Sequence, residues 1–221
     1  MPEAPRTDQL AGRLAELRAG LEDCDPHVLA RNTAAVFHSA TGEAGVFRLD
    51  YWDRPVEIDF PALAACDPDT GGPLPDFVQA MLLYYFSTSD GAPTAGKWIS
   101  FSELPDGRFY SQAFQGYTGR ELAGVFHGDL DGFTRAAAKL AGEHISLLGD
   151  AAYRIQALPL VPLLVVAWLG DEDFQPAYQI LFDANVSHHL PTDACAVLGS
   201  TLTGRLIRAK LETPYPLSPN P

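Results

Sequence analysis

The residues best suited to chemistry lie together near the carboxyl end of the chain: Asp183, His188, His189 and Asp193. Imidazole and carboxylate groups together bind divalent ions of the zinc or iron type, and they also transfer protons near neutral pH. An apolar run predicts a strand that ends at Asp183, and Thr192 is suited to begin a helix. Strand ends and helix starts often carry binding residues. We therefore predict a site here, with these four side chains as candidate metal ligands.

The same segment has a structural interpretation that stays open at this point. Adjacent histidines on an extended segment point to opposite faces, so only one imidazole is expected to face a site. In the alternative, one of His188 and His189 packs inside the protein and the other is solvated. Asp183 could equally accept hydrogen bonds from the backbone of the turn that follows it.

Aromatic side chains are concentrated between Trp98 and Tyr117. Their flat rings could stack on a planar ligand, or they could simply form core. His38 offers a further imidazole if the fold brings it close. The candidate cofactor-binding residues are therefore His188, His189, Trp98, Tyr110 and His38.

Several common functions are disfavoured by the sequence. It contains no Walker A motif, no GxGxxG after a strand, no GxSxG and no HExxH. A net charge of −13 would repel phosphate backbones and anionic lipids, so we expect no nucleic-acid partner and no membrane. The three cysteines form no CxxC pair and suit a reducing cytoplasm, and we expect Cys195 to pack as a small apolar residue.

The hydropathy pattern also predicts a cytoplasmic protein. The longest apolar run, residues 158–169, contains Pro159 and Pro162 and is too short to span a bilayer. The first residues lack the apolar region of a signal peptide. Leucines at 10, 14, 17 and 21 instead predict an amphipathic helix within residues 1–23, through which the protein could form a homo-oligomer.

The remaining helices and strands are expected to follow one another without a regular alternation. Asp25 and Pro26 should begin a second helix that fades by about Phe37, with His38 at its end. Alternating apolar residues predict a β-hairpin over 47–60, and a loop over 87–96 has the composition of a lid or of a surface insertion. Further helices are expected over 76–86, from Asp131 and from Thr192, and further strands over 97–101, 153–157, 163–168 and 178–182.

Strands that come as hairpins between helices favour an α+β fold with a largely antiparallel sheet packed by helices. We expect a single domain over residues 24–212, preceded by the amphipathic helix and followed by a loose, proline-rich tail over 213–221.

Four segments occur in the order of a known family: WISFSELPDGRFY, GDAAYRIQALPLVPL, WLGDEDFQPAYQILFD and HHLPTD. Over roughly residues 25–210 the chain resembles an uncharacterised bacterial and archaeal domain of unknown function. Some members look like fusions to the iron–sulfur domain of corrinoid proteins in anaerobic metabolism. The resemblance implies a role beside redox cofactors or tetrapyrroles. Because the N-terminus of this chain lacks the clustered cysteines of the fused members, we expect no iron–sulfur cluster here. The resemblance supplies no catalytic residues.

These observations lead to three hypotheses. The first is a small-molecule or cofactor-binding protein, with haem, a corrinoid or another metal complex held by His188 or His189. The second is a metal-dependent enzyme in which Asp183, one histidine and Asp193 bind a divalent ion that activates water. There, Glu103 or the acidic turn over 171–173 would accept the proton. The third is a non-catalytic module that pairs through its first helix.

Overall fold

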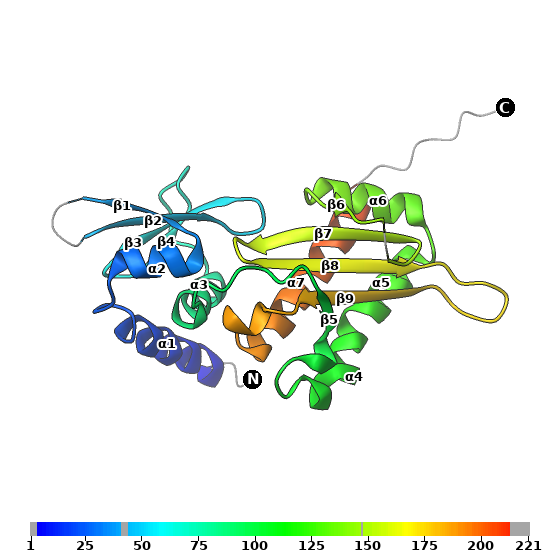
Figure 1. Ribbon diagram of the computed structural model, residues 1–221, viewed down its shortest axis with the longest axis horizontal. Coiled ribbons are helices and arrows are strands. Elements are labelled where there is room, and N and C mark those ends of the chain that lie inside the picture. The colour runs from blue at the N-terminus through cyan, green and yellow to red at the C-terminus, as the bar shows by residue number, and fades with distance from the viewer. Residues whose placement is uncertain (1–3, 41–43, 147, 213–221) are drawn as a thin grey trace. The chain divides into compact units, whose positions relative to one another are not determined.

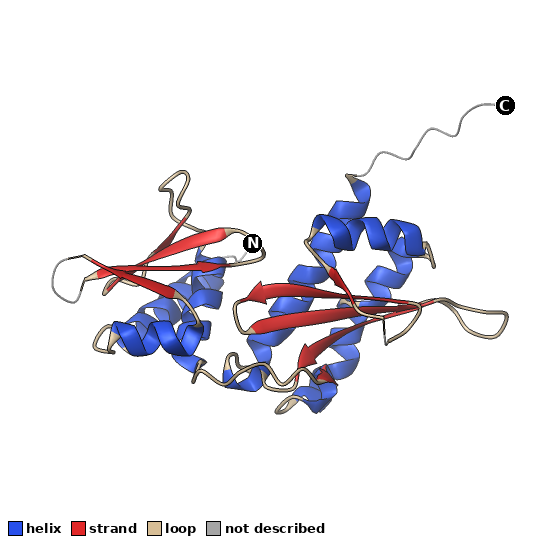
Figure 2. Ribbon diagram, turned by 45° about the horizontal axis from the view of Figure 1, so that its top comes forward, coloured by secondary structure: helices blue, strands red, loops and turns tan. Residues whose placement is uncertain are grey.

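The computed structural model describes residues 4–40, 44–146 and 148–212, which group into two compact units. The first unit comprises the residues up to 98 together with 156–162 and 183–195. The second comprises residues 99–155, 163–182 and those from 196 onward. Each unit combines helices with strands (Figures 1 and 2).

The first unit is built on an antiparallel four-stranded sheet in the order β1-β2-β3-β4 (Figure 1). The strands are β1 (Val36–Ser39), β2 (Gly45–Asp50), β3 (Pro55–Phe60) and β4 (Ala65–Cys66). The helices are α1 (Ala4–Ala19), α2 (Pro26–Thr33) and α3 (Asp76–Thr88).

Period-two alternation determines which face of this sheet is buried. On β2, Phe47 and Leu49 are buried while Arg48 and Asp50 are exposed. The Phe47 ring lies 5.0 Å from the Phe86 ring of α3, centroid to centroid, so α3 packs on the inner face. The hairpin expected over 47–60 is confirmed by the β2–β3 pairing.

The second helix is shorter than its sequence suggested. Asp25 accepts a hydrogen bond from the His27 N–H and begins α2, as expected. The helix ends at Thr33 because Ala34 adopts a left-handed conformation, with φ of 52°. The chain then pairs with β2, so the prediction that His38 ends a helix was wrong: His38 lies on β1, opposite Val46.

Of the four leucines predicted to form the apolar stripe, Leu10 is half-buried and the other three are buried within the chain itself, Leu21 lying just after the end of α1. Leu14, Leu17 and Leu21 are each at most 8% exposed. Arg13 and Arg18 of α1 donate hydrogen bonds to Tyr84 and Gln79 of α3. The apolar stripe is thus largely covered by other parts of the same chain. A homo-oligomer through this helix stays a prediction.

The other sheet has five strands in the order β5-β9-β8-β7-β6. They are β5 (Trp98–Ser100), β6 (Glu143–His144), β7 (Ala151–Leu158), β8 (Val161–Trp168) and β9 (Ala177–Asp183). The associated helices are α4 (Gly107–Tyr117), α5 (Gly119–Phe126), α6 (Leu130–Lys139) and α7 (Thr192–Leu211), with short 3-10 turns at Phe101–Glu103 and Val186–His188. The near-continuous burial of β8 agrees with its lack of polar residues.

Aromatic rings on the helices pack against β9. Phe126 and Phe133 contact Tyr178, and Phe114 contacts Phe182, which lies four residues further along β9. Of the aromatic stretch, Phe101 and Phe114 belong to the core, whereas Phe109 and Tyr110 are exposed. The helices α4 and α5 were not revealed by sequence periodicity. The helix expected from Asp131 is α6, and Asp129 caps it by accepting a hydrogen bond from the Gly132 N–H.

The α+β class with antiparallel sheets is thus confirmed, with the strands divided between two sheets. The boundaries drawn at residues 23 and 212 stay predictions, and the tail over 213–221 lies outside the described residues. Within the described ranges, no helix combines the length and apolar character needed to cross a bilayer.

Candidate functional site

Asp183, the first of the predicted site residues, ends β9 and is only 2% exposed. Its carboxylate accepts hydrogen bonds from the backbone N–H groups of Ala95 and Gly96, each at 2.8 Å, and of Asn185 at 2.9 Å. The hydrogen bond from the Asn185 N–H matches the alternative in which Asp183 accepts from the backbone of the turn that follows it. Both carboxylate oxygens are therefore engaged with the backbone.

The two histidines have different environments, as the structural interpretation expected. His189 is fully buried, and its Nε2 lies 2.9 Å from the Ala92 carbonyl oxygen. Because a carbonyl only accepts, Nε2 carries the proton, and Nδ1 faces the Ser89 hydroxyl at 3.3 Å. His188 is half exposed, and its Nδ1 lies 2.7 Å from a carboxylate oxygen of Asp90.

Loop 89–96 is held by these same side chains. Besides the contacts of Asp183, His188 and His189, the Asn185 side chain donates to the Pro93 carbonyl at 2.8 Å. The Ala184 N–H donates to the Lys97 carbonyl at 2.8 Å. The segment with a lid-like composition is thus anchored along its length, and the predicted site residues fix this loop.

Burial of His189 makes the stability of the protein depend on pH. Desolvation lowers the pKa of His189, so the folded protein holds the neutral ring while the unfolded chain takes up a proton near its ordinary pKa of about 6.5. The contribution of the neutral, buried His189 ring to the free energy of unfolding is therefore complete above about pH 6.5 and is lost as the pH falls below that value. We expect the free energy of unfolding in urea to fall more between about pH 7.5 and about pH 5.5 than it does in His189→Gln.

The control for this measurement is His38→Gln, because His38 is an exposed histidine on β1. That variant should keep the pH dependence of the parent protein. An equal pH dependence in the parent and in His189→Gln would contradict the assignment.

The remaining predicted residues do not complete a site. Asp193 is exposed in the first turn of α7, His38 is exposed on β1, and Trp98 is partly buried on β5. Tyr110, on α4 of the second unit, is 62% exposed. Glu103 accepts hydrogen bonds from the Ser100 N–H and hydroxyl.

Metal binding gains no support from the arrangement of ligands. In the part of the chain that the structure describes, no three His, Cys, Asp or Glu side chains are grouped so that they could hold a metal ion. Cys195 is fully buried in α7, as expected, and burial raises the pKa of its thiol to about 12. The proposed metal ligands and cofactor ligands stay predictions from the sequence.

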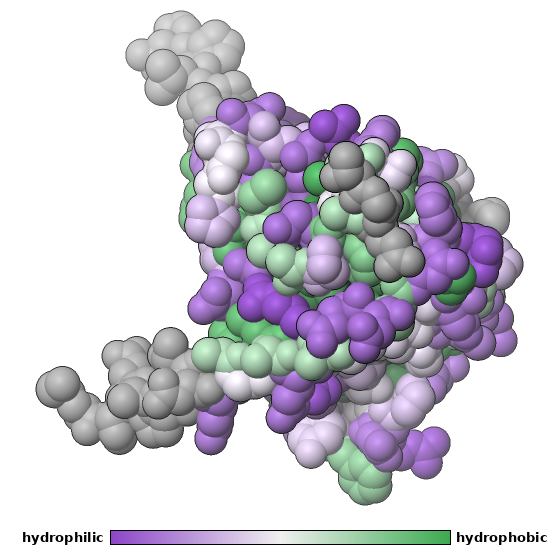
Figure 3. All heavy atoms as spheres, turned by 90° about the vertical axis from the view of Figure 1, so that its left-hand side faces the viewer, coloured by the Kyte–Doolittle hydropathy of each residue, from purple (hydrophilic) through white to green (hydrophobic). Residues whose placement is uncertain are grey.

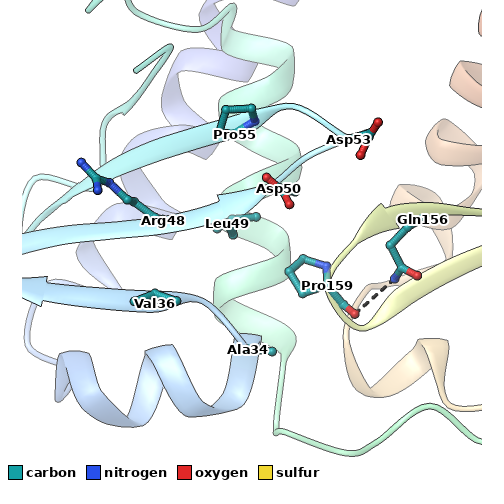
Figure 4. A pocket seen from close by; sticks show the side chains of 9 residues that line it. All are labelled: Ala34, Val36, Arg48, Leu49, Asp50, Asp53, Pro55, Gln156 and Pro159. Atoms are coloured by element: carbon teal, nitrogen blue, oxygen red, sulfur yellow. Dashed lines mark hydrogen bonds between the residues drawn. The ribbon is translucent and has the colours of Figure 1, made fainter. Parts of the chain in front are cut away.

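A pocket of about 470 Å³ lies within the first unit, at one end of β1, β2 and β3 (Figure 4). The tip of the β7–β8 hairpin, which belongs to the same unit, borders it on the other side through Gln156 and Pro159. Its lining consists of Ala34, Val36, Arg48, Leu49, Asp50, Asp53, Pro55, Gln156 and Pro159.

Strand register and one backbone hydrogen bond position this lining. Val36 pairs with Arg48, and Asp50 pairs with Pro55. The Trp52 N–H in the β2–β3 turn donates to the Ala157 carbonyl at 3.0 Å and so holds the turn against the hairpin tip. The side chains around the pocket are therefore set by the fold itself.

Some charged side chains around the pocket have an ion-pair partner and others do not. Arg48 forms an ion pair with Glu57, with Nη2 at 2.6 Å and Nε at 2.7 Å from the same carboxylate oxygen. Asp50 and Asp53 are exposed, and their carboxylates make no ion pair or hydrogen bond with any described residue. On the face shown in Figure 3, hydrophilic residues are interspersed with hydrophobic ones.

Sequence reasoning missed this pocket because its walls come from segments about a hundred residues apart. The available signal was local: Asp50 precedes the β2–β3 turn, Asp53 lies in it, and Pro159 sits in the tight turn between β7 and β8. Neither turn shows in the sequence that it faces the other.

Comparison with known proteins identifies a family. The family model described as "Domain of unknown function (DUF3786)" matches residues 25–205. No curated protein and no solved structure matches the chain. Since the matched region covers most of the sequence, the chain belongs to this domain family of unknown function.

Proposed function

We propose that this protein binds a small organic molecule in the pocket at the end of β1, β2 and β3. The observation that carries the proposal is the pocket itself: its volume of about 470 Å³ lies within the range of known ligand sites, about 300–1,000 Å³. Apolar side chains with a few polar groups are the usual lining of such sites. The strand register and the bond between Trp52 and Ala157 support a pocket formed before the ligand arrives.

Binding suits this lining better than catalysis. The residues around the pocket include no histidine, cysteine, serine or lysine, so the carboxylates of Asp50 and Asp53 are its candidate nucleophiles or bases, with no imidazole or thiol beside them. A tetrapyrrole or a catalytic metal held by His188 and His189 would be a separate site. Those ideas remain sequence predictions, tested by an absorption spectrum after addition of haem or cobalamin and by metal analysis of the purified protein.

Filling the pocket should weaken binding whatever the ligand is. Val36 lines the pocket and is 57% exposed, so Val36→Trp adds volume there without burying the ring in the core. We expect fragments that bind the parent protein, detected by fluorine NMR with a mixed library of neutral and charged compounds, to lose at least about tenfold in affinity.

Val28→Trp is the matched control, because Val28 is an exposed valine on α2 outside the pocket lining. It should bind the same fragments as the parent protein. Fragments that bind Val36→Trp as well as they bind the parent, or the absence of any binding fragment, would contradict the proposal.

A further inference from the structure

We infer that the ligand of this pocket carries a positively charged nitrogen, an ammonium or a guanidinium, on a short apolar stem. This inference rests on the proposed function and adds the chemical class of the ligand.

The pocket lining carries more negative than positive side chains. The carboxylates of Asp50 and Asp53 form no ion pair or hydrogen bond with a described residue, while Arg48, the one cation of the lining, is already paired with Glu57. In Figure 4 the Arg48 side chain extends along the strands away from the hairpin tip. A cation entering beside Asp50 and Asp53 would therefore meet uncompensated negative charge, and the net charge of −13 would draw cations toward the protein.

The lining supplies few free hydrogen-bond donors, which an anionic ligand would need. Pro55, which pairs with Asp50, and Pro159 on the hairpin tip have no N–H group. The Gln156 amide nitrogen donates to the carbonyls of Leu158 and Pro159. The lining thus favours a ligand that donates hydrogen bonds over one that accepts them.

The β2–β3 turn fixes the position of Asp53. Trp52 and Asp53 both have positive φ, 53° and 59°, and Trp52 is 3% exposed. A buried tryptophan and the bond from its N–H to the Ala157 carbonyl anchor the turn, so the adjacent Asp53 is held at the pocket. Asp50 lies at the end of β2, across the same turn (Figure 4).

An organic cation suits the lining better than a metal ion. Calcium takes six to eight oxygen ligands, and magnesium keeps several waters beside one or two carboxylates. Here the walls formed by Ala34, Val36 and Leu49 offer apolar contact in place of further oxygen ligands. The walls give a methylene stem apolar contact, and the carboxylates accept hydrogen bonds from the charged end.

The test is a titration of the full chain, followed by isothermal calorimetry and by backbone NMR shifts. The probes are agmatine, spermidine and benzylamine as cations, and glutarate as an anion. At least one cation should bind with shifts at Val36, Leu49 and Asp50, and its affinity should fall as salt rises from about 20 mM to about 200 mM. Glutarate should not bind.

Asp50→Asn combined with Asp53→Asn should weaken the cation by about tenfold, the effect of losing a charge-assisted hydrogen bond. Both side chains are exposed, so the fold should persist, and circular dichroism checks it. Asp173→Asn is the matched control, because Asp173 is an exposed aspartate in the second unit. It should change the dissociation constant less than about twofold.

The outcomes separate this inference from the proposed function. If neutral fragments bind in a manner sensitive to Val36→Trp, but no cation binds or the Asp50 and Asp53 double variant binds cations normally, the charge assignment is overturned and the pocket function stands. If no compound binds, both fall. N-acetyl-arginine amide identifies the source of the cation: binding as tight as that of agmatine indicates a protein side chain, and weaker binding indicates a free metabolite.

Discussion

Replacing Asp183 with alanine is expected to lower the free energy of unfolding by about 3 to 5 kcal/mol. The change removes the acceptor for three backbone N–H groups, those of Ala95, Gly96 and Asn185, at a carboxylate that is 2% exposed. A donor left unsatisfied in a buried place costs about 1 to 3 kcal/mol. Urea denaturation followed by circular dichroism measures the loss.

A second readout shows whether the loss arises at this loop. Hydrogen exchange of the Ala95 and Gly96 amides should accelerate in Asp183→Ala more than exchange in the rest of the first unit. The comparison variant is Asp173→Ala, an exposed aspartate, which should stay within about 0.5 kcal/mol of the parent. Equal stability of the two variants would show that Asp183 is free for another role, including metal binding.

Phe114→Ala should cost about 3 to 5 kcal/mol through the cavity that it leaves. The Phe114 ring is 2% exposed and stacks on Phe101, with centroids 4.2 Å apart and planes within 9°. It also contacts the Phe182 ring of β9. Gly199 of α7 lies so close that a Cβ atom there would stand 2.5 Å from the Phe114 ring, which leaves no room for the neighbours to shift freely.

The same helix supplies the control for this variant. Phe109→Ala removes an identical side chain from α4 at a position that is 83% exposed, and it should change stability by less than about 0.5 kcal/mol. Thermal unfolding of both variants gives the comparison. Similar losses at the two positions would mean that the helix faces are assigned the wrong way round.

Local patterns predicted much of the fold for a physical reason. Alternation over 47–60 determines a strand pair because successive side chains point to opposite faces, and the β2–β3 register agrees with it. The run over 163–168 predicted a buried strand because it has no polar residue to place in water. The helices α4 and α5 were missed; on α4 the aromatic residues Phe109 and Tyr110 are exposed while Phe114 is buried, so ring content did not mark the inner face.

The chemistry near residue 183 could be located from the sequence but not interpreted from it. Side-chain types and spacing identified Asp183, His188 and His189 as unusual. Their partners, however, are backbone and side-chain groups of loop 89–96, which is almost a hundred residues away in the sequence. A carboxylate that accepts backbone N–H groups and one that binds a metal have the same residue type, so only the partners distinguish them.

The sequence by itself therefore determined the α+β class, the main strands and helices, the burial of Cys195 and the acidic charge, because each follows from composition or from contacts close along the chain. Tertiary structure alone decided which histidine is buried, that helix α2 ends before β1, and that Asp50, Asp53 and Pro159 line one pocket. These features depend on pairings between distant segments, and the free energy of such pairings is spread over many contacts that no short pattern records.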